Sequence, residues 1–202
     1  MGGDWLKVVS LNSEKMIVLA SRSESRKKAL RLLGLKFRTI PSKIDENAFK
    51  EKMPELRAKG LAELKASSVA KKLKNAVVIG ADLIVVYRNK IYEKPKSRSE
   101  ALAMLKSFSG KTVTIVAGLA VVDSGSGKML STVEKCKVKF RKLTNSEIKE
   151  YIAKYPVLKF SAAFDGNAVL MFAERVEGSI AFYTGIPLNE LVLFLRKLRC
   201  LK

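Results

Sequence analysis

The sequence predicts an α/β fold, with an elongated mixed β-sheet flanked by helices and two lobes around a cleft. Short apolar runs alternate with segments of helical periodicity along most of the chain. Residues 112–123 and 128–141 read as two long strands, and the Gly- and Ser-rich residues 124–127 join them as a hairpin. Residues 77–82 are apolar up to one carboxylate, which is typical of a strand buried on both faces.

In the first half of the chain, the patterns predict a strand over residues 16–20, a helix over 26–33, a strand over 36–40, a helix over 60–73 and a hairpin over 84–92. Gly34 suits the end of the first helix, because glycine adopts the left-handed conformation without strain. The central strand is expected to end at Asp82. The alternative is that Asp82 is a turn residue between two hairpin strands.

In the second half, the patterns predict a helix over residues 101–108, the long hairpin, a helix over 148–155, strands over 168–173 and 179–183, and a helix over 188–198. Pro187 suits the first turn of the last helix. Residues 1–15 are expected to be an N-terminal extension that precedes one domain over residues 16–202.

The composition limits the chemistry that the chain can use. It has 202 residues, 48% of them hydrophobic, two widely spaced cysteines and no histidine. Without histidine, a metal would be held by carboxylates and water, which favours a hard divalent cation such as Mg²⁺ or Mn²⁺. No apolar run reaches the length of a membrane span, and no signal sequence is visible. Unpaired cysteines suit the reducing cytoplasm.

The excess of basic over acidic residues suggests a different function. There are 39 basic and 19 acidic residues, which gives a net charge of +20. Such a surface attracts polyanions, so the alternative is a basic nucleic-acid-binding protein without catalytic activity. However, the excess is spread along the chain without a basic tail. Aromatic residues form only 7% of the chain, and no base-stacking motif is visible, so nucleic acid is not the expected partner.

A hydroxyl-rich turn separates the first strand from the first helix. Free backbone N–H groups and the helix dipole make such a turn an anion-binding arrangement. The alternative for Ser21 and Ser23 is that one of them only caps the helix. Two other residues have equally plain alternatives: Glu46 lies in a loop where acids are usually solvated, and a lysine placed like Lys65 usually reaches solvent.

Six short motifs follow one another along the chain: LASRS at residues 19–23, IDE at 44–46, LAELKA at 61–66, GAD at 80–82, KP at 94–95 and GIPL at 185–188. Each motif is weak by itself. Together, over about 170 residues, they resemble the Maf family, also called the septum formation inhibitor proteins. The resemblance implies the fold of the inosine triphosphate pyrophosphatases.

The resemblance further implies metal-dependent hydrolysis of nucleoside triphosphates to a nucleoside monophosphate and pyrophosphate. This activity clears pyrimidine nucleotides such as dTTP and UTP, or modified nucleotides, from the nucleotide pool. By family position, Asp82 is the proton acceptor or metal-associated base, and Glu46 is the second carboxylate and a metal ligand. Five residues would bind the substrate: Ser21, Ser23, Arg26, Lys65 and Lys94. The family also suggests a homodimer.

The chain departs from the family pattern at the positions linked to the choice of base. A PRR sequence in the family is Glu24-Ser25-Arg26 here, so the proline and the first arginine are replaced. The GADT sequence ends in Leu83, and Asp165 stands where the family has Gln or Glu. The resemblance therefore predicts the reaction and leaves the base open.

Overall fold

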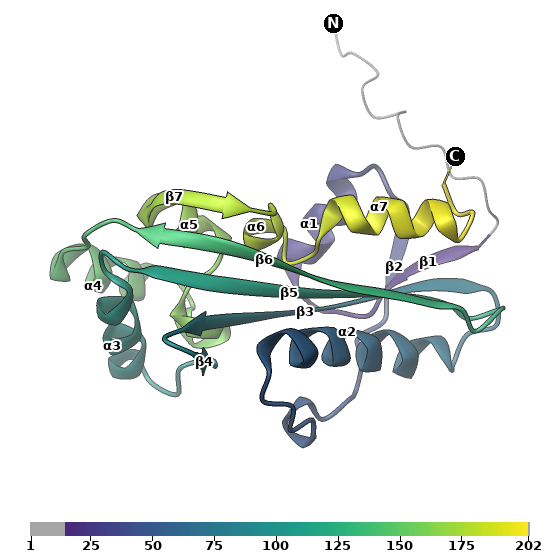
Figure 1. Ribbon diagram of the computed structural model, residues 1–202, viewed down its shortest axis with the longest axis horizontal. Coiled ribbons are helices and arrows are strands. Elements are labelled where there is room, and N and C mark those ends of the chain that lie inside the picture. Colours follow the sequence, from purple (N-terminus) through teal and green to yellow (C-terminus); the bar gives the residue numbers. More distant parts are fainter. Residues whose placement is uncertain (1–14, 202) are drawn as a thin grey trace, which may run out of the picture. The chain divides into compact units, whose positions relative to one another are not determined.

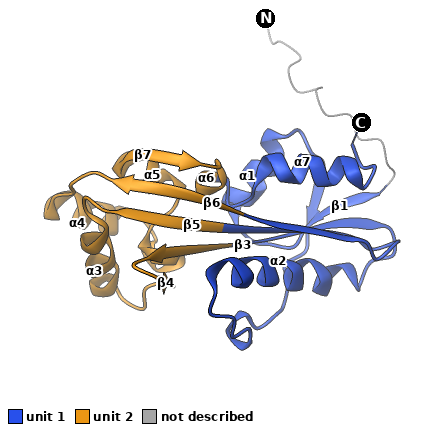
Figure 2. Cartoon of the chain, in the orientation of Figure 1, with its two compact units in different colours: residues 1–82, 117–133, 184–202 blue, residues 83–116, 134–183 orange. Residues whose placement is uncertain are grey.

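The computed structural model describes residues 15–201 (Figure 1). All of the predicted N-terminal extension except Lys15 lies outside the described residues. Contact density divides the chain into two compact units, which Figure 2 shows in different colours. Within the described residues, unit 1 comprises 15–82, 117–133 and 184–201, and unit 2 comprises 83–116 and 134–183.

Within the described chain, seven strands form one mixed sheet in the order β2-β1-β3-β5-β6-β7, with β4 paired to β3. The strands are β1 (Met16–Leu19), β2 (Phe37–Thr39), β3 (Ala76–Tyr87), β4 (Lys90–Tyr92), β5 (Thr112–Asp123), β6 (Met129–Phe140) and β7 (Ala173–Gly178). β1 is parallel to β2 and β3, whereas β4 and β7 are antiparallel to their partners. The predicted α/β class with a mixed sheet is confirmed.

The α-helices of the described chain are α1 (Glu24–Leu32), α2 (Pro54–Ala70), α3 (Arg98–Phe108), α4 (Asn145–Lys154), α5 (Gly166–Phe172), α6 (Ala181–Thr184) and α7 (Leu188–Lys197). Three short 3-10 helices are η2 (Glu46–Ala48), η3 (Val157–Lys159) and η4 (Ser161–Ala163). Among residues 15–201, no helix combines the length and the hydropathy that crossing a membrane requires.

Unit 1 has helices on both faces of its part of the sheet, with α1 and α7 on one face and α2 on the other (Figure 1). Successive residues of β1 point to opposite faces, as strand geometry requires. Ile17 and Leu19 pack with α1 and α7, whereas Val18 packs with α2. Both faces are therefore apolar, and this explains why the strands read as continuous hydrophobic runs.

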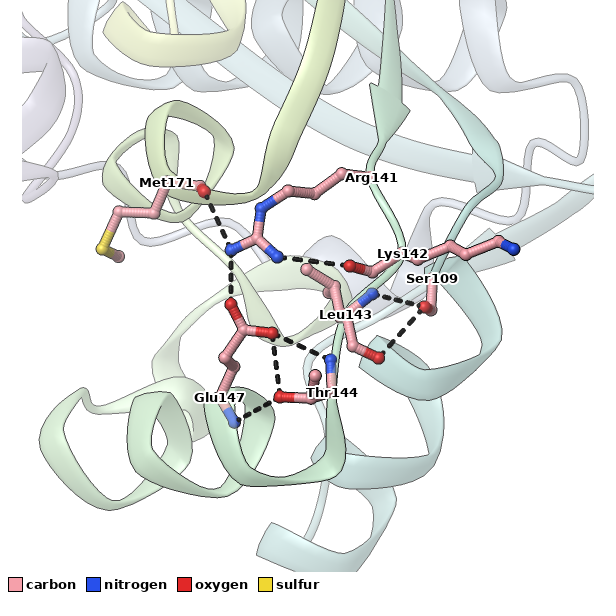
Figure 3. A network of polar contacts seen from close by, with 7 residues as sticks. All are labelled: Ser109, Arg141, Lys142, Leu143, Thr144, Glu147 and Met171. Atoms are coloured by element: carbon pink, nitrogen blue, oxygen red, sulfur yellow. Dashed lines mark hydrogen bonds and ion pairs between the residues drawn. The ribbon is translucent and has the colours of Figure 1, made fainter.

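Unit 2 has a core rich in aromatic rings. Phe108, Phe140 and Phe164 lie with ring centroids 5.4–6.0 Å apart, in tilted or edge-to-face contact. Nearby, the Arg141–Glu147 pair links the end of β6 to the first turn of α4 (Figure 3). The same carboxylate accepts hydrogen bonds from Thr144, which completes a capping box at the start of α4.

Several predicted elements have different bounds or a different type. The strand predicted over residues 168–173 is wrong, because residues 168–172 belong to α5 and β7 begins only at Ala173. Asp165 caps α5 by accepting a hydrogen bond from the backbone N–H of Ala168. The strand predicted over 179–183 is also wrong, since the last strand is β7 and α6 follows it. In addition, α2 begins at Pro54, six residues before the predicted start. A short apolar run does not separate strand from helix by periodicity alone.

Candidate active site

Asp82 lies inside a strand and is almost fully buried. The prediction that the strand ends at Asp82 is wrong, and so is the alternative of a turn, because β3 continues unbroken to Tyr87. The apolar residues after Asp82 extend the strand, and only 7% of Asp82 is exposed. A carboxylate in this position needs a partner to offset the loss of hydration.

Lys65 supplies that partner and contacts a second carboxylate as well. Its Nζ lies 2.6 Å from Asp82 Oδ1 and 3.0 Å from Glu46 Oε1. The alternative for Lys65, that its side chain reaches solvent, is wrong, since only 5% of the residue is exposed. One ammonium group is thus shared by two carboxylates from separate segments, so the structure brings together three of the predicted site residues.

Two glycines allow α2 to lie this close to the sheet. A Cβ on Gly80 would be 2.2 Å from the carbonyl oxygen of Ala62, and a Cβ on Gly118 would be 2.1 Å from that of Ala58. Gly80 and Asp82 share a strand face because side chains alternate along a strand. This role was not predicted from the sequence, although a glycine inside an apolar strand signals close backbone approach.

Glu46 occupies the more open side of the cluster. It begins η2, where Asp45 caps the turn by accepting a hydrogen bond from the backbone N–H of Asn47 at 3.0 Å. The Glu46 side chain is 54% exposed, whereas that of Asp82 is 10% exposed. The two carboxylates therefore differ in environment, and the shielded Asp82 is the better placed of the two to act on a substrate from which water is excluded.

The serine turn holds Arg26 near the carboxylates. Ser21 Oγ accepts hydrogen bonds from the backbone N–H of Ser23 and from Arg26 Nη1, each at 3.1 Å. Arg26 Nε donates to the carbonyl oxygen of Gly185 at 3.2 Å, so the turn is tied to the GIPL segment. Burial lowers the pKa of Arg26, while the charges of Asp82 and Glu46 raise it. The guanidinium remains charged and adds to the positive field at the cluster.

Ser23 caps a helix, which is the role given to it by the alternative to phosphate binding. It is the N-cap of α1, and its side chain accepts from the backbone N–H of Arg26 at 3.5 Å. A cap at this long distance is weak, and it leaves the hydroxyl able to bind another group. Its role as a phosphate ligand stays a prediction.

Lys94 belongs to unit 2, whereas the six other predicted site residues belong to unit 1. It is exposed and lies on the segment between β4 and α3. Its contact with a triphosphate stays a prediction. Asp165, one of the departures from the family pattern, accepts a hydrogen bond from Tyr151 Oη at 3.4 Å in addition to capping α5.

The donor set suits a divalent cation that is shared with a substrate. Among the described residues, no group of three or more Asp, Glu or Cys side chains forms a protein-only metal cage. Mg²⁺, however, is usually held by one or two carboxylates together with substrate phosphates and water. Glu46 and Asp82 approach one cationic group within 3.0 Å, so their oxygens meet the first part of that requirement.

Comparisons with known proteins show which proteins this chain resembles. The chain is 40% identical over 186 residues to a dTTP/UTP pyrophosphatase of Geobacillus sp. (strain WCH70), which covers 91% of this chain and 98% of the relative. A dTTP/UTP pyrophosphatase of Thermoanaerobacter sp. (strain X514) is 39% identical, with 90% of this chain and 95% of the relative covered. For the dTTP/UTP pyrophosphatase of Aquifex aeolicus (strain VF5), the identity is 37% and the coverage is 92% and 96%.

The family assignment rests on most of the chain. Residues 16–198 match the family described as Maf-like protein, a range that includes every predicted site residue. The chain therefore belongs to the Maf-like protein family.

Proposed function

We propose that this protein hydrolyses nucleoside triphosphates to a nucleoside monophosphate and pyrophosphate. The observation that carries the proposal is the buried Lys65 ammonium held between Asp82 and Glu46. Burying a charged cluster costs free energy, and a fold keeps one where chemistry requires it. Relatives that match over nearly their whole length are named dTTP/UTP pyrophosphatase, which supports this reaction.

The reaction needs an activated water and a neutralised leaving group. The water oxygen attacks the α-phosphorus, the bond from this phosphorus to the α–β bridging oxygen breaks, and pyrophosphate leaves with that oxygen. Asp82 accepts the proton that the water loses, since without histidine a carboxylate is the natural base. Lys65 and Arg26 stabilise the negative charge that develops on the phosphates.

Glu46 and Asp82 would hold the divalent cation, Mg²⁺ or Mn²⁺, which when bound neutralises charge on the triphosphate. Ser21, Ser23 and Lys94 would bind phosphate oxygens, the serines through the turn before α1. Because α1 has nine residues and its N-terminus follows this turn, its dipole also favours an anion there. These proposed metal and phosphate contacts would add to the contacts that the unit 1 residues already make with one another.

Pyrimidine triphosphates such as dTTP and UTP are the proposed substrates, on the strength of the relatives' names. Ser25 and Leu83 stand where the family pattern has other residues, so the choice of base is tested with several nucleotides. We place the reaction in the cytoplasm, which suits the buried thiols of Cys136 and Cys200, since neither forms a disulfide within residues 15–201. A homodimer stays a prediction.

A nucleotide panel tests this proposal. Purified protein with Mg²⁺ or Mn²⁺ is offered dTTP, UTP, CTP, ITP and 7-methyl-GTP, and pyrophosphate release is measured with and without chelator. We expect selective, chelator-sensitive release from dTTP and UTP. If the folded protein releases no pyrophosphate from any nucleotide and instead binds nucleic acid in a steeply salt-dependent manner, the non-catalytic alternative replaces the proposal.

A further inference from the structure

The turn η4 in unit 2 contains two successive alanines with left-handed backbone conformation. Ala162 has φ 55° and ψ 24°, and Ala163 has φ 66°. A side chain with a Cβ is strained in this region, and such strain persists only where the surroundings hold it. Both alanines are fully buried, so the turn is fixed by its packing.

This turn is hydrogen-bonded to the segment that carries Lys94. The backbone N–H of Ala162 donates to the carbonyl oxygen of Glu93 at 3.0 Å, across 69 residues of sequence. The next amide, that of Ala163, donates within the turn to the carbonyl of Phe160 at 3.1 Å. Ala162 thus provides a hydrogen bond through which η4 holds the neighbour of Lys94.

The other side of Lys94 is held as well. Pro95 is buried, and the backbone N–H of Lys96 donates to Glu100 Oε2 at 2.7 Å. Ser97 then caps α3 by accepting from the backbone N–H of Glu100. Between these anchors the Lys94 side chain is exposed, and within residues 15–201 it makes no ion pair or hydrogen bond. The segment therefore presents, on a fixed backbone, an ammonium group that no described residue pairs with.

We propose that Ala162 is a positioning residue, which sets the backbone of Lys94 so that its ammonium group meets the phosphates of the substrate. The inference rests on the proposed function, because that function supplies the polyanion. A group that is already placed loses less conformational freedom when it binds a ligand. The left-handed pair gives the turn the shape that aims the Ala162 amide at Glu93.

A double-mutant cycle tests the coupling between the two residues. Ala162→Val places a β-branched residue at positive φ and in a filled site, and so displaces the turn. We expect kcat/KM for UTP to fall about 10-fold in this variant, mainly through KM, and less than about 2-fold when Lys94→Ala is already present. Equal losses in both backgrounds would overturn the inference.

Two variants separate this effect from general damage to the core. Ala168→Val adds the same two methyl groups at an equally buried alanine with helical backbone, and we expect KM to stay unchanged. Ala162→Gly keeps the amide and accepts the positive φ, so it should retain the parent KM. If Ala162→Val does not fold, the smaller Ala162→Ser takes its place in the cycle.

Hydrogen exchange provides a readout that does not depend on turnover. We expect the peptide that contains residues 93–97 to exchange faster in Ala162→Val than in the parent protein, and at the parent rate in Ala168→Val. Unchanged exchange in Ala162→Val would overturn the inference. If the parent protein does not hydrolyse any nucleotide, the proposed function fails, while the exchange rates still decide whether Ala162 holds the Lys94 segment.

Discussion

The Lys65 cluster of unit 1 and the Arg141–Glu147 pair of unit 2 use the same chemistry in different ways. Both contain a cation 2.6 Å from a carboxylate oxygen. The Lys65 and Asp82 side chains are 7% and 10% exposed, whereas those of Arg141 and Glu147 are 39% and 35% exposed. Water therefore screens the second pair far more than the first.

The two clusters also differ in how much of the fold is needed to form them. Glu147 lies three residues after Thr144 and closes a capping box, so the sequence nearby determines most of its contacts (Figure 3). Lys65 meets residues from β3 and η2, and it reaches Asp82 only because Gly80 lets α2 approach. The capping role of Glu147 accounts for its contacts, whereas a buried charge shared by distant segments indicates a functional site.

The largest expected effect is a loss of turnover when Asp82, but not Glu147, loses its carboxylate. Asp82→Asn keeps the shape of the side chain and removes the base, so we expect turnover to fall about 10³-fold. It also removes one negative partner of the buried Lys65 ammonium, so the melting temperature should fall as well, and turnover is compared at a temperature where both proteins are folded. Glu147→Gln is the matched control and should keep parent turnover. Asp82→Asn protein that retains a tenth of parent turnover would remove Asp82 from the chemistry.

The next largest effect concerns the close approach of α2 to the sheet, on which the Lys65 cluster depends. Gly80→Ala puts a Cβ into the backbone of α2, and we expect a loss of about 2–3 kcal/mol in the free energy of unfolding, measured by urea denaturation, together with lost activity. Gly125→Ala is the control, because its added Cβ would meet its neighbours at 3.5 Å or more, an ordinary contact distance. Equal stability of the two variants would show that the close approach does not matter.

A pair of helix caps sharpens the comparison. Ser23→Ala and Thr144→Ala each remove an N-cap side chain. Thr144→Ala should lower the free energy of unfolding by about 1 kcal/mol, and Ser23→Ala should lower it by less, because its cap hydrogen bond is long. Only Ser23→Ala should also raise KM for UTP, because only that turn would bind phosphate. Steady-state kinetics and thermal denaturation of both variants check this. Equal KM values for Ser23→Ala and Thr144→Ala would show that Ser23 acts only as a helix cap.

The smallest effect is a change in the dependence of stability on pH. The hydrogen bond from Arg141, followed by those from Thr144, lowers the pKa of Glu147 from 4.5 to about 2. A lowered pKa in the folded state stabilises the protein fully above the unfolded value, and this contribution disappears as the pH falls from about 5 toward 2. The difference in unfolding free energy between the parent and Glu147→Gln should therefore shrink over that interval, and a constant difference would exclude this origin.

Much of the fold could be predicted from local patterns. β1, β5, α3 and α4 follow from apolar periodicity and from their caps, and each lies close to its expected range. The segment around α5 could not be assigned in this way. Its burial at Ala168, Val169 and Phe172 fits a helix, but the helix type depends on the Asp165 cap and on tertiary packing.

The residues of the site could be named from their motifs, but their geometry could not. Glu46, Lys65 and Asp82 were all predicted, although the prediction for Lys65 was only phosphate binding. That its ammonium joins both carboxylates depends on the distance between α2 and the sheet, which backbone contacts at Gly80 and Gly118 determine. Such contacts link distant segments and leave no periodic signal in the sequence.

Hydrolysis of UTP in isotopically labelled water tests the central claim most directly. Mass spectrometry of the products of the parent protein and of Asp82→Asn measures both stoichiometry and the site of attack. We predict one pyrophosphate for each UMP, with the labelled oxygen in UMP, and product formation that is about 10³-fold slower with Asp82→Asn than with the parent protein. Label in pyrophosphate, or equal product formation by Asp82→Asn, would contradict it.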